Sequence, residues 1–205
     1  MKLVAVQIKL AFNCEECMQP IPLGGLVEKP RCDKCQSPAE PDWQKMLNFG
    51  NPTVTIVEWA QEAEDGDCET GGFASIHLDA ECKPLQCACG ATWDAAAIAA
   101  EGQPACPACA KPIASRRTPP HITEHYPQIV CVVGETQIAE DGEVPGAAKP
   151  VMFACMNCGA PLRIDGTQRI VDCGSCDVPN FIPDALWLRL HPAKKREPFW
   201  LVIEA

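Results

Sequence analysis

Cysteine pairs are the residues whose type and spacing carry the clearest chemistry. Cysteine makes up 15 of the 205 residues, several times its ordinary usage. Two cysteines separated by two residues can direct both thiolates at one cation from a tight turn. Two such turns complete a tetrahedron of four sulfurs about 2.3 Å from a zinc ion. Five pairs have this spacing and a sixth is one residue shorter: Cys14/Cys17, Cys32/Cys35, Cys106/Cys109, Cys155/Cys158, Cys173/Cys176 and the short Cys87/Cys89.

In chain order these pairs form three double pairs, with loops of similar length inside them (18–31, 90–105 and 159–172). The spacing is close to that of known zinc sites built from four cysteines. We therefore expect three Zn²⁺ ions per chain, each in a closed structural site without an open coordination position. The twelve expected ligands are Cys14, Cys17, Cys32, Cys35, Cys87, Cys89, Cys106, Cys109, Cys155, Cys158, Cys173 and Cys176.

The middle double pair departs from the regular spacing. Matching CACGA (87–91) with CMNCGA (155–160) leaves Gln86 where the third double pair has a cysteine. We expect Cys87 to supply the missing ligand through a Cys-x-Cys turn, because closing a short turn costs less chain entropy. Cys82, further upstream, is the alternative ligand.

The remaining cysteines and the closely spaced histidines have simpler interpretations. Cys131 lies in an apolar run, where a free cysteine packs as a small hydrophobe. Cys68 lies in an acidic stretch, and we expect neither cysteine to be catalytic. His121 and His125 have a spacing that occurs in zinc sites, but every nearby tetrahedron is already filled by cysteine, so we expect them on the surface. The sequence shows no Ser-His-Asp arrangement, phosphate loop or open metal site, and we expect no enzymatic activity.

Composition narrows the class of protein further. No apolar run is long enough to span a membrane, and the first residues do not have the pattern of a secretory signal. We therefore expect a cytoplasmic protein, in which cysteine pairs bind metal and do not form disulfides. The net charge of −10 disfavours nucleic acid and anionic lipid as main partners, since both are polyanions.

Each double pair is flanked by apolar runs. Alternating runs at 4–12 and 74–80 and a short run at 151–153 precede the double pairs and predict entering strands. Further runs at 53–59, 128–133 and 199–204 follow them, each directly after a proline, and predict returning strands. The connectors beginning at Pro41 and Pro183 are similar to each other, and each predicts one or two helical turns behind an aspartate cap.

The sequence thus predicts three tandem repeats of one structural unit. The predicted units are 1–60, 71–135 and 149–205, joined by an acidic linker (61–70) and an acidic Gly/Pro linker (136–148). The fold class is small, mostly β and metal-stabilised, with three tandem ribbons each extended by flanking strands. Asp165-Gly166 predicts a hairpin turn in the third unit, whereas the alanine-rich stretch 94–100 favours a short helix in the second. The acidic linkers predict that each unit folds alone; the alternative is one continuous sheet whose returning strands pair between units.

The segment from Cys155 to Cys176, CMNCGAPLRIDGTQRIVDCGSC, resembles bacterial zinc ribbons of the rubredoxin-like knuckle class. The resemblance extends over nearly all of the chain as three tandem copies. It implies that Cys155, Cys158, Cys173 and Cys176 bind zinc, and likewise the four cysteines of the first copy. The first copy lacks the glycine that usually follows each pair. The ribbon class says little about biological role.

We expect a non-catalytic zinc-binding scaffold, adaptor or subunit that binds another protein. Its candidate contact residues are the tryptophans, with packing against the small ribbons as the alternative: Trp43, Trp59, Trp93, Trp187 and Trp200. One alternative function is a rubredoxin-like iron electron carrier, because four thiolates also hold iron. Another is a transcription- or translation-associated ribbon protein, for which 116–117 and 194–196 are the basic runs. The oligomeric state stays open.

Overall fold

A computed structural model describes residues 2–49, 54–73, 75–87, 89–101, 105–137, 151–164, 166, 168–190 and 196–205. It confirms the expected fold class: strands make up 36% of it and helices 15%, and three cysteine tetrads are present. No helix among these residues is long and apolar enough to cross a membrane. The predicted turn residue Asp165, most of the second linker (138–148) and two basic residues, Lys194 and Lys195, lie outside the described residues.

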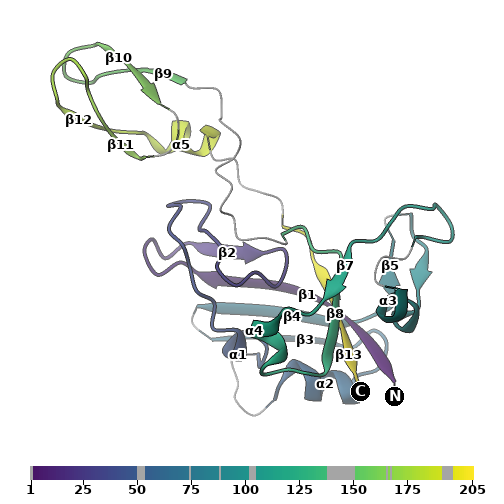
Figure 1. Cartoon of the computed structure of the whole chain (residues 1–205). Helices are drawn as coiled ribbons and strands as arrows, with labels where there is room; N and C mark the ends of the chain where they lie inside the picture. Colours follow the sequence, from purple (N-terminus) through teal and green to yellow (C-terminus); the bar gives the residue numbers. More distant parts are fainter. Residues whose placement is uncertain are drawn as a thin grey trace.

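A seven-stranded antiparallel sheet forms the main body (Figure 1). Its order is β3-β4-β1-β13-β8-β7, with β2 paired to the far end of β1. The seven strands are β1 (Leu3–Asn13), β2 (Pro20–Leu23), β3 (Cys68–Phe73), β4 (Ile76–Cys82), β7 (Ser115–Arg117), β8 (Ile129–Val133) and β13 (Phe199–Glu204).

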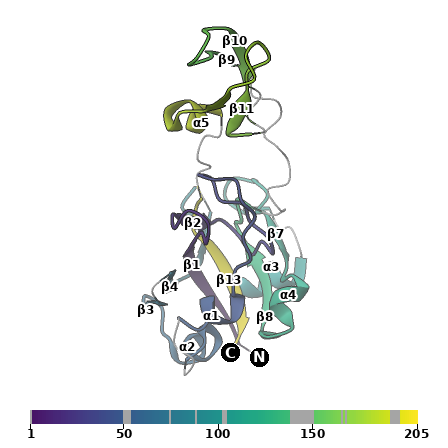
Figure 2. The ribbon, with the colours of Figure 1, turned by 90° about the vertical axis from the view of Figure 1, so that its left-hand side faces the viewer.

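We call each double pair of cysteines, with the residues around it, a ribbon: the first is 14–42, the second 83–114 and the third 151–190. Three two-stranded sheets accompany the cysteine pairs of the second and third ribbons. They are β5 (Leu85–Gln86) with β6 (Thr92–Trp93), β9 (Val151–Ala154) with β10 (Pro161–Ile164), and β11 (Ile170–Asp172) with β12 (Pro179–Phe181). The third ribbon stands apart from the main sheet in both views (Figures 1 and 2). It contacts the first ribbon where Trp187 Nε1 donates to the carbonyl oxygen of Lys34, 3.0 Å away.

Strand pairing between the predicted units is the main departure from the sequence-based expectation. The entering strand β1 pairs with the next entering strand, β4, and with the last returning strand, β13. In turn β13 pairs with β8, the returning strand of the second predicted unit. The expectation that returning strands extend their own ribbons is therefore wrong: β8 and β13 pair between the predicted units, as in the alternative, while β9 stays in a separate two-stranded sheet with β10. The unit boundaries themselves stay a prediction.

The alternating sequence of β1 explains how the sheet is covered on both faces. Val4, Val6 and Ile8 belong to the larger core, which α1 (Trp43–Met46), α2 (Ile56–Glu62) and α4 (Pro120–Thr123) complete. Leu3 and Ala5 point to the opposite face, where a smaller core packs against α3 (Ala95–Glu101). Inner strands covered on both sides hold the sheet through the burial of apolar surface.

The run 53–59, expected as a returning strand, instead contributes to helix α2. Thr55 caps the helix by accepting from the Glu58 backbone N–H, and the Glu58 carboxylate accepts from the Thr55 backbone N–H at 2.8 Å. The Thr55 backbone N–H, and then the Thr55 hydroxyl, which donates to the same carboxylate at 2.9 Å, lower the pKa of the Glu58 carboxyl. This capping box and the helical spacing of the buried Ile56 and Ala60 favour a helix. Together they outweigh the preference of the β-branched residues in this run for a strand. The first linker, 61–70, contains the end of α2 and the start of β3.

Other local expectations have mixed outcomes. Asp42 caps α1 by accepting from the Lys45 backbone N–H, and the alanine-rich stretch forms α3, so both expectations are confirmed. The second connector forms α5 (Asp184–Leu190), with Asp184 as its first residue and not as a cap. The predicted hairpin across Gly166 is wrong, because β10 pairs with β9 and β11 with β12.

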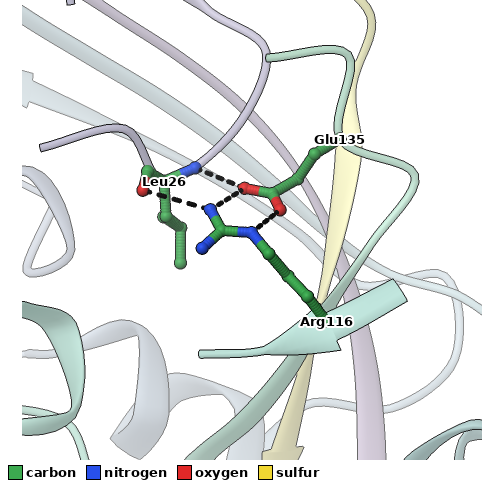
Figure 3. A network of polar contacts seen from close by, with 3 residues as sticks. All are labelled: Leu26, Arg116 and Glu135. Carbon is green, nitrogen blue, oxygen red and sulfur yellow. Dashed lines mark hydrogen bonds and ion pairs between the residues drawn. The ribbon is translucent and has the colours of Figure 1, made fainter. Parts of the chain in front are cut away.

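An ion pair between the buried Glu135 and the half-buried Arg116 fastens the loop after β2 to the end of β8 (Figure 3). The Glu135 carboxylate accepts from Arg116 Nη2 at 2.8 Å and from the Leu26 backbone N–H at 2.7 Å. Arg116 Nη2 also donates to the Leu26 carbonyl oxygen. Gly25 lies so close that a Cβ there would meet the Gln137 carbonyl oxygen at 2.2 Å. Residues of the first and second predicted units are therefore joined by buried polar contacts as well as by strand pairing.

Replacing Glu135 by leucine should lower the free energy of unfolding by about 3 kcal/mol, because Arg116 and the Leu26 N–H lose their buried acceptor. Urea unfolding of the metal-loaded chain measures the change. The double variant Arg116→Met/Glu135→Leu, which leaves no charge behind, should recover at least about 1 kcal/mol of this loss. A double variant less stable than Glu135→Leu would contradict this account.

Candidate metal centres

The structure brings all twelve predicted cysteines together as three tetrads. Within each tetrad the four sulfur atoms lie within 4.8 Å of one another. In every tetrad two short sulfur–sulfur distances join the two pairs, each between the first cysteine of one pair and the second cysteine of the other. They are Cys14–Cys35 at 3.5 Å, Cys17–Cys32 at 3.6 Å, Cys87–Cys109 at 3.7 Å, Cys89–Cys106 at 3.6 Å, Cys155–Cys176 at 3.7 Å and Cys158–Cys173 at 3.6 Å.

These separations suit four ligands around one ion. A tetrahedron with metal–sulfur bonds of about 2.3 Å has edges of about 3.8 Å, close to the observed distances. A disulfide would need about 2.05 Å, and all the cysteines of the described residues are free. Each tetrad in that part of the chain contains four thiols and no histidine or carboxylate. The geometry is therefore that of a closed four-sulfur site, which zinc and iron both fit.

Each regular pair lies in the same hydrogen-bonded turn. In each turn, the residue directly after the second cysteine donates its N–H to the carbonyl oxygen of the first cysteine. The first cysteine in turn donates its own N–H to the carbonyl oxygen of the second residue after the pair. In the third ribbon, Gly159 N donates to Cys155 O at 2.9 Å and Cys155 N to Ala160 O at 2.8 Å. These backbone hydrogen bonds hold both sulfurs on one side of the turn.

The short pair of the middle site keeps this pattern with one residue fewer. Gly90 N donates to Cys87 O at 2.8 Å, and Cys87 N donates to Ala91 O at 2.8 Å. Cys82, the alternative ligand, is buried at the end of β4 and lies outside the tetrad. The turn itself therefore explains why Cys-x-Cys can replace Cys-x-x-Cys here.

All six turns place the residue after the second cysteine in the left-handed region of positive φ. Glycine occupies it twice, at Gly90 (φ +89°) and Gly159 (φ +73°). Larger residues take the same conformation in the other four turns, at Met18, Gln36, Ala110 and Asp177 (φ +56°, +61°, +56° and +54°). The first ribbon thus forms regular turns without glycine, at a cost of roughly 1–2 kcal/mol for each residue with a Cβ.

Local hydrogen bonds and burial set the proton affinities of the thiols. The backbone N–H of Cys158 and then that of Asn157 donate to the Cys155 sulfur and lower its pKa to about 6. Burial raises the pKa of Cys32 to about 12. Further N–H donors reach the third tetrad, including Asn157 Nδ2, 3.6 Å from the Cys176 sulfur. Donors of this kind stabilise thiolates, the form that binds a metal ion.

The other candidate residues lie away from the tetrads. Cys131 is buried in the core behind β8, as expected, and Cys68 is exposed on β3. His125 is exposed and contacts Gln44, as expected, whereas His121 lies against the Trp43 ring and is half-buried. None of the five tryptophans is exposed, so the expectation of exposed contact residues is wrong. Trp187 packs in the core of the third ribbon, as in the alternative, whereas Trp43, Trp59 and Trp200 pack in cores of the main sheet.

One contact beside the first site was not visible in the sequence. Lys34, between two cysteines of the first tetrad, accepts the indole N–H of Trp187, and the neighbouring Asp33 lies 3.8 Å from the Arg196 guanidinium. These contacts join the third ribbon to a cysteine turn of the first. Residues so far apart in sequence give no periodic or spacing signal that could reveal such a contact.

Comparisons of the chain with protein-family models, with curated proteins and with solved structures find no match. The assignment of a role therefore depends on the geometry of the three tetrads and their surroundings.

Replacing Cys87 by serine should remove one metal ion per chain, because the short turn would then present only one thiolate. Cys82→Ser should keep all three ions, since Cys82 packs in the sheet. Elemental analysis of both purified variants measures the count. Loss of one ion from Cys82→Ser with none lost from Cys87→Ser would transfer the ligand role to Cys82.

The positive-φ positions should respond to glycine in opposite directions. Ala110→Gly should raise the free energy of unfolding by about 0.5–1 kcal/mol, because glycine adopts this conformation without a Cβ clash. Gly159→Ala should lower it by about 1–2 kcal/mol, an effect of the backbone alone, since a Cβ at Gly159 would meet no atom within 4 Å. Urea unfolding of the metal-loaded chains tests the pair, and effects of the same sign in both variants would contradict the strain argument.

Proposed function

We propose that this chain is a non-catalytic, zinc-binding scaffold or adaptor that presents its surface to another protein. Three Zn²⁺ ions per chain, one in each tetrad, hold the cysteine turns in place. The ligands are the twelve cysteines of the tetrads. We place the protein in the cytoplasm, where the thiols stay reduced and available to the metal.

The observation that carries this proposal is that each tetrad is complete with four thiols. A catalytic zinc site keeps one position open for water or substrate, whereas a closed site of four cysteines is structural. Among the described residues no histidine or carboxylate joins the tetrads, so no general base adjoins an open metal position. The sites therefore support a role in folding and shape and not in catalysis.

The small size of the ribbon cores supports the same role for the metal. The third ribbon has two small clusters, one of which contains Ile164, Ile182, Trp187 and Leu190 as its buried residues. An apolar core of this size supplies little stability, and small folds commonly add a metal ion to compensate. Binding at a structural zinc site contributes roughly 10 kcal/mol or more.

The surface of the third ribbon supports a partner-binding role. Among the described residues, seven large apolar side chains are exposed, and five of them lie between 151 and 181, namely Met152, Met156, Ile170, Val178 and Phe181. Met156 is the most exposed, at 81%. Apolar groups gathered on one small module are typical of contact surfaces.

Removing the metal should unfold the ribbons and spare much of the main sheet. In the native chain, elemental analysis should find three zinc ions, and the solution should be colourless. After chelation, backbone amides of Ile164 and Ile182 should lose protection from hydrogen exchange, because their core is too small to persist alone. Val6 and Leu201, buried in the main sheet, serve as internal controls and should keep most of their protection.

Two outcomes would contradict the proposal. A red chain containing ferric iron would indicate the rubredoxin-like electron carrier instead. A third ribbon that kept its amide protection without metal would show that the ion has no structural role. Salt-dependent retention on nucleic acid would favour the transcription- or translation-associated alternative.

A further inference from the structure

An open groove of about 720 Å³ lies beside the first cysteine turn. It runs between the end of β1, the turn itself, the segment before α1 and the start of β4. Its apolar floor comes from Phe12, Met46 and Ile76, which are all buried in the main core. Met18 lines the groove with its side chain 65% exposed. The groove therefore offers a large apolar side chain both a floor and a flexible neighbour.

The groove is also strongly acidic. Glu15, Glu16, Glu40 and Asp42 line it, against a single cation, Lys45. Asp42 pairs with Lys45 at 2.9 Å, and Glu40 pairs with Lys29 at 3.3 Å. Within the described residues, Glu15 and Glu16 make no ion pair. Cys14 lines the groove too, and a Zn²⁺ ion with four thiolates carries a formal charge of −2.

These features select among possible occupants. A metal ion is disfavoured, because in the described part of the chain only the cysteine tetrads bring three or more ligand atoms within 4.8 Å of one another. Nucleic acid is disfavoured because both surfaces would be negative. A basic segment that carries an apolar residue matches both the spread-out carboxylates and the apolar floor. The chain's net charge of −10 would also steer a basic partner toward it.

We infer that this groove, beside the first metal site, is the docking surface for a basic segment of a partner protein, with Lys or Arg flanking a large apolar residue. Glu15 and Glu16 pair with the basic side chains, and Met18 and the floor receive the apolar one. The inference rests on the proposed function, since it names the class of partner that the metal-loaded scaffold binds.

The test uses the full metal-loaded chain and a fluorescein-labelled peptide, GKRLRKG, in a polarisation titration at about 0.15 M salt. Glu15→Gln/Glu16→Gln should weaken binding about tenfold, the effect of losing two partly exposed ion pairs. The matched control Glu62→Gln/Glu64→Gln makes the same change in net charge away from the groove and should alter the affinity by less than about twofold. Met18→Asn should weaken binding about fivefold, and asparagine tolerates the positive φ at this position.

Two further peptides separate charge from apolar contact. GKRSRKG, without the leucine, should bind several-fold more weakly, and the acidic GEELEEG should not bind. Equal affinity for the wild-type chain and the Glu15/Glu16 double variant would overturn the inference. Self-association of the chain lost with the same double variant would overturn it as well, by identifying the occupant as a second copy.

Metal analysis of every variant distinguishes this inference from the proposed function. If each chain holds three zinc ions and unfolds its ribbons on chelation, yet no basic peptide binds at the groove, only the docking surface is wrong. If the wild-type chain keeps its ribbons folded without metal, the structural role of zinc fails, whatever the peptide result.

Discussion

The structure depends above all on the position of β13 between β1 and β8. This strand lies near the end of the sequence, yet it is an inner strand of the main sheet, antiparallel to both neighbours. Leu201, Val202 and Ile203 are fully buried, and they alternate between cores on the two faces of the sheet. Because an inner strand satisfies the backbone groups of both neighbours, β13 joins the first and second parts of the chain.

The cysteine ribbons are attached to this sheet in different ways. The first ribbon lies between β1 and α1 and shares the main core through Cys14 and Cys32. The second lies between β4 and β7 and packs through α3 against the opposite face. The third, between β8 and β13, has small cores of its own. We therefore expect the three metal ions to contribute unequally to the stability of the whole chain, with the third ribbon most dependent on its ion.

The six cysteine turns show that different sequences adopt the same backbone conformation. The same two hydrogen bonds form around Cys-x-x-Cys and around the shorter Cys87-x-Cys89 pair. Met18 and Gln36 accept a conformation that glycine adopts at Gly159. The positive φ is set by the need to aim two sulfurs at one point, so side-chain preference is secondary. A large side chain at this position also leaves an exposed apolar group next to the metal site, as Met18 shows.

The division of polar and apolar surface is consistent with binding to proteins. The five exposed apolar residues of the third ribbon and the acidic groove at the first ribbon lie on different ribbons. Between them, Trp187 and Arg196 contact the second cysteine turn of the first ribbon. These contacts join the third ribbon to the second cysteine turn of the first.

The sequence by itself determined the parts that depend on local spacing. Two residues between thiolates suffice to aim both sulfurs at one ion, so the sequence identified the first and third tetrads. At the middle site it favoured Cys87 over Cys82, and the structure places Cys87 in the tetrad. The alternation in 4–12 and the apolar run after a proline at 199–204 identified β1 and β13 for the same reason, since both signals are local. The Thr55–Glu58 capping box, which begins α2, is also a local feature of the sequence.

Only the tertiary structure decided which strands pair. The entering and returning runs are all apolar and none carries a signal for its partner, so the sequence allows three small sheets as readily as one large sheet. The choice is made by long-range burial, with helices on both faces, and by the ion pair of Arg116 with the buried Glu135, which fastens the loop after β2 to β8. Hydrophobic contact is non-directional, so its pattern along the chain says which residues are buried but not which partner buries them.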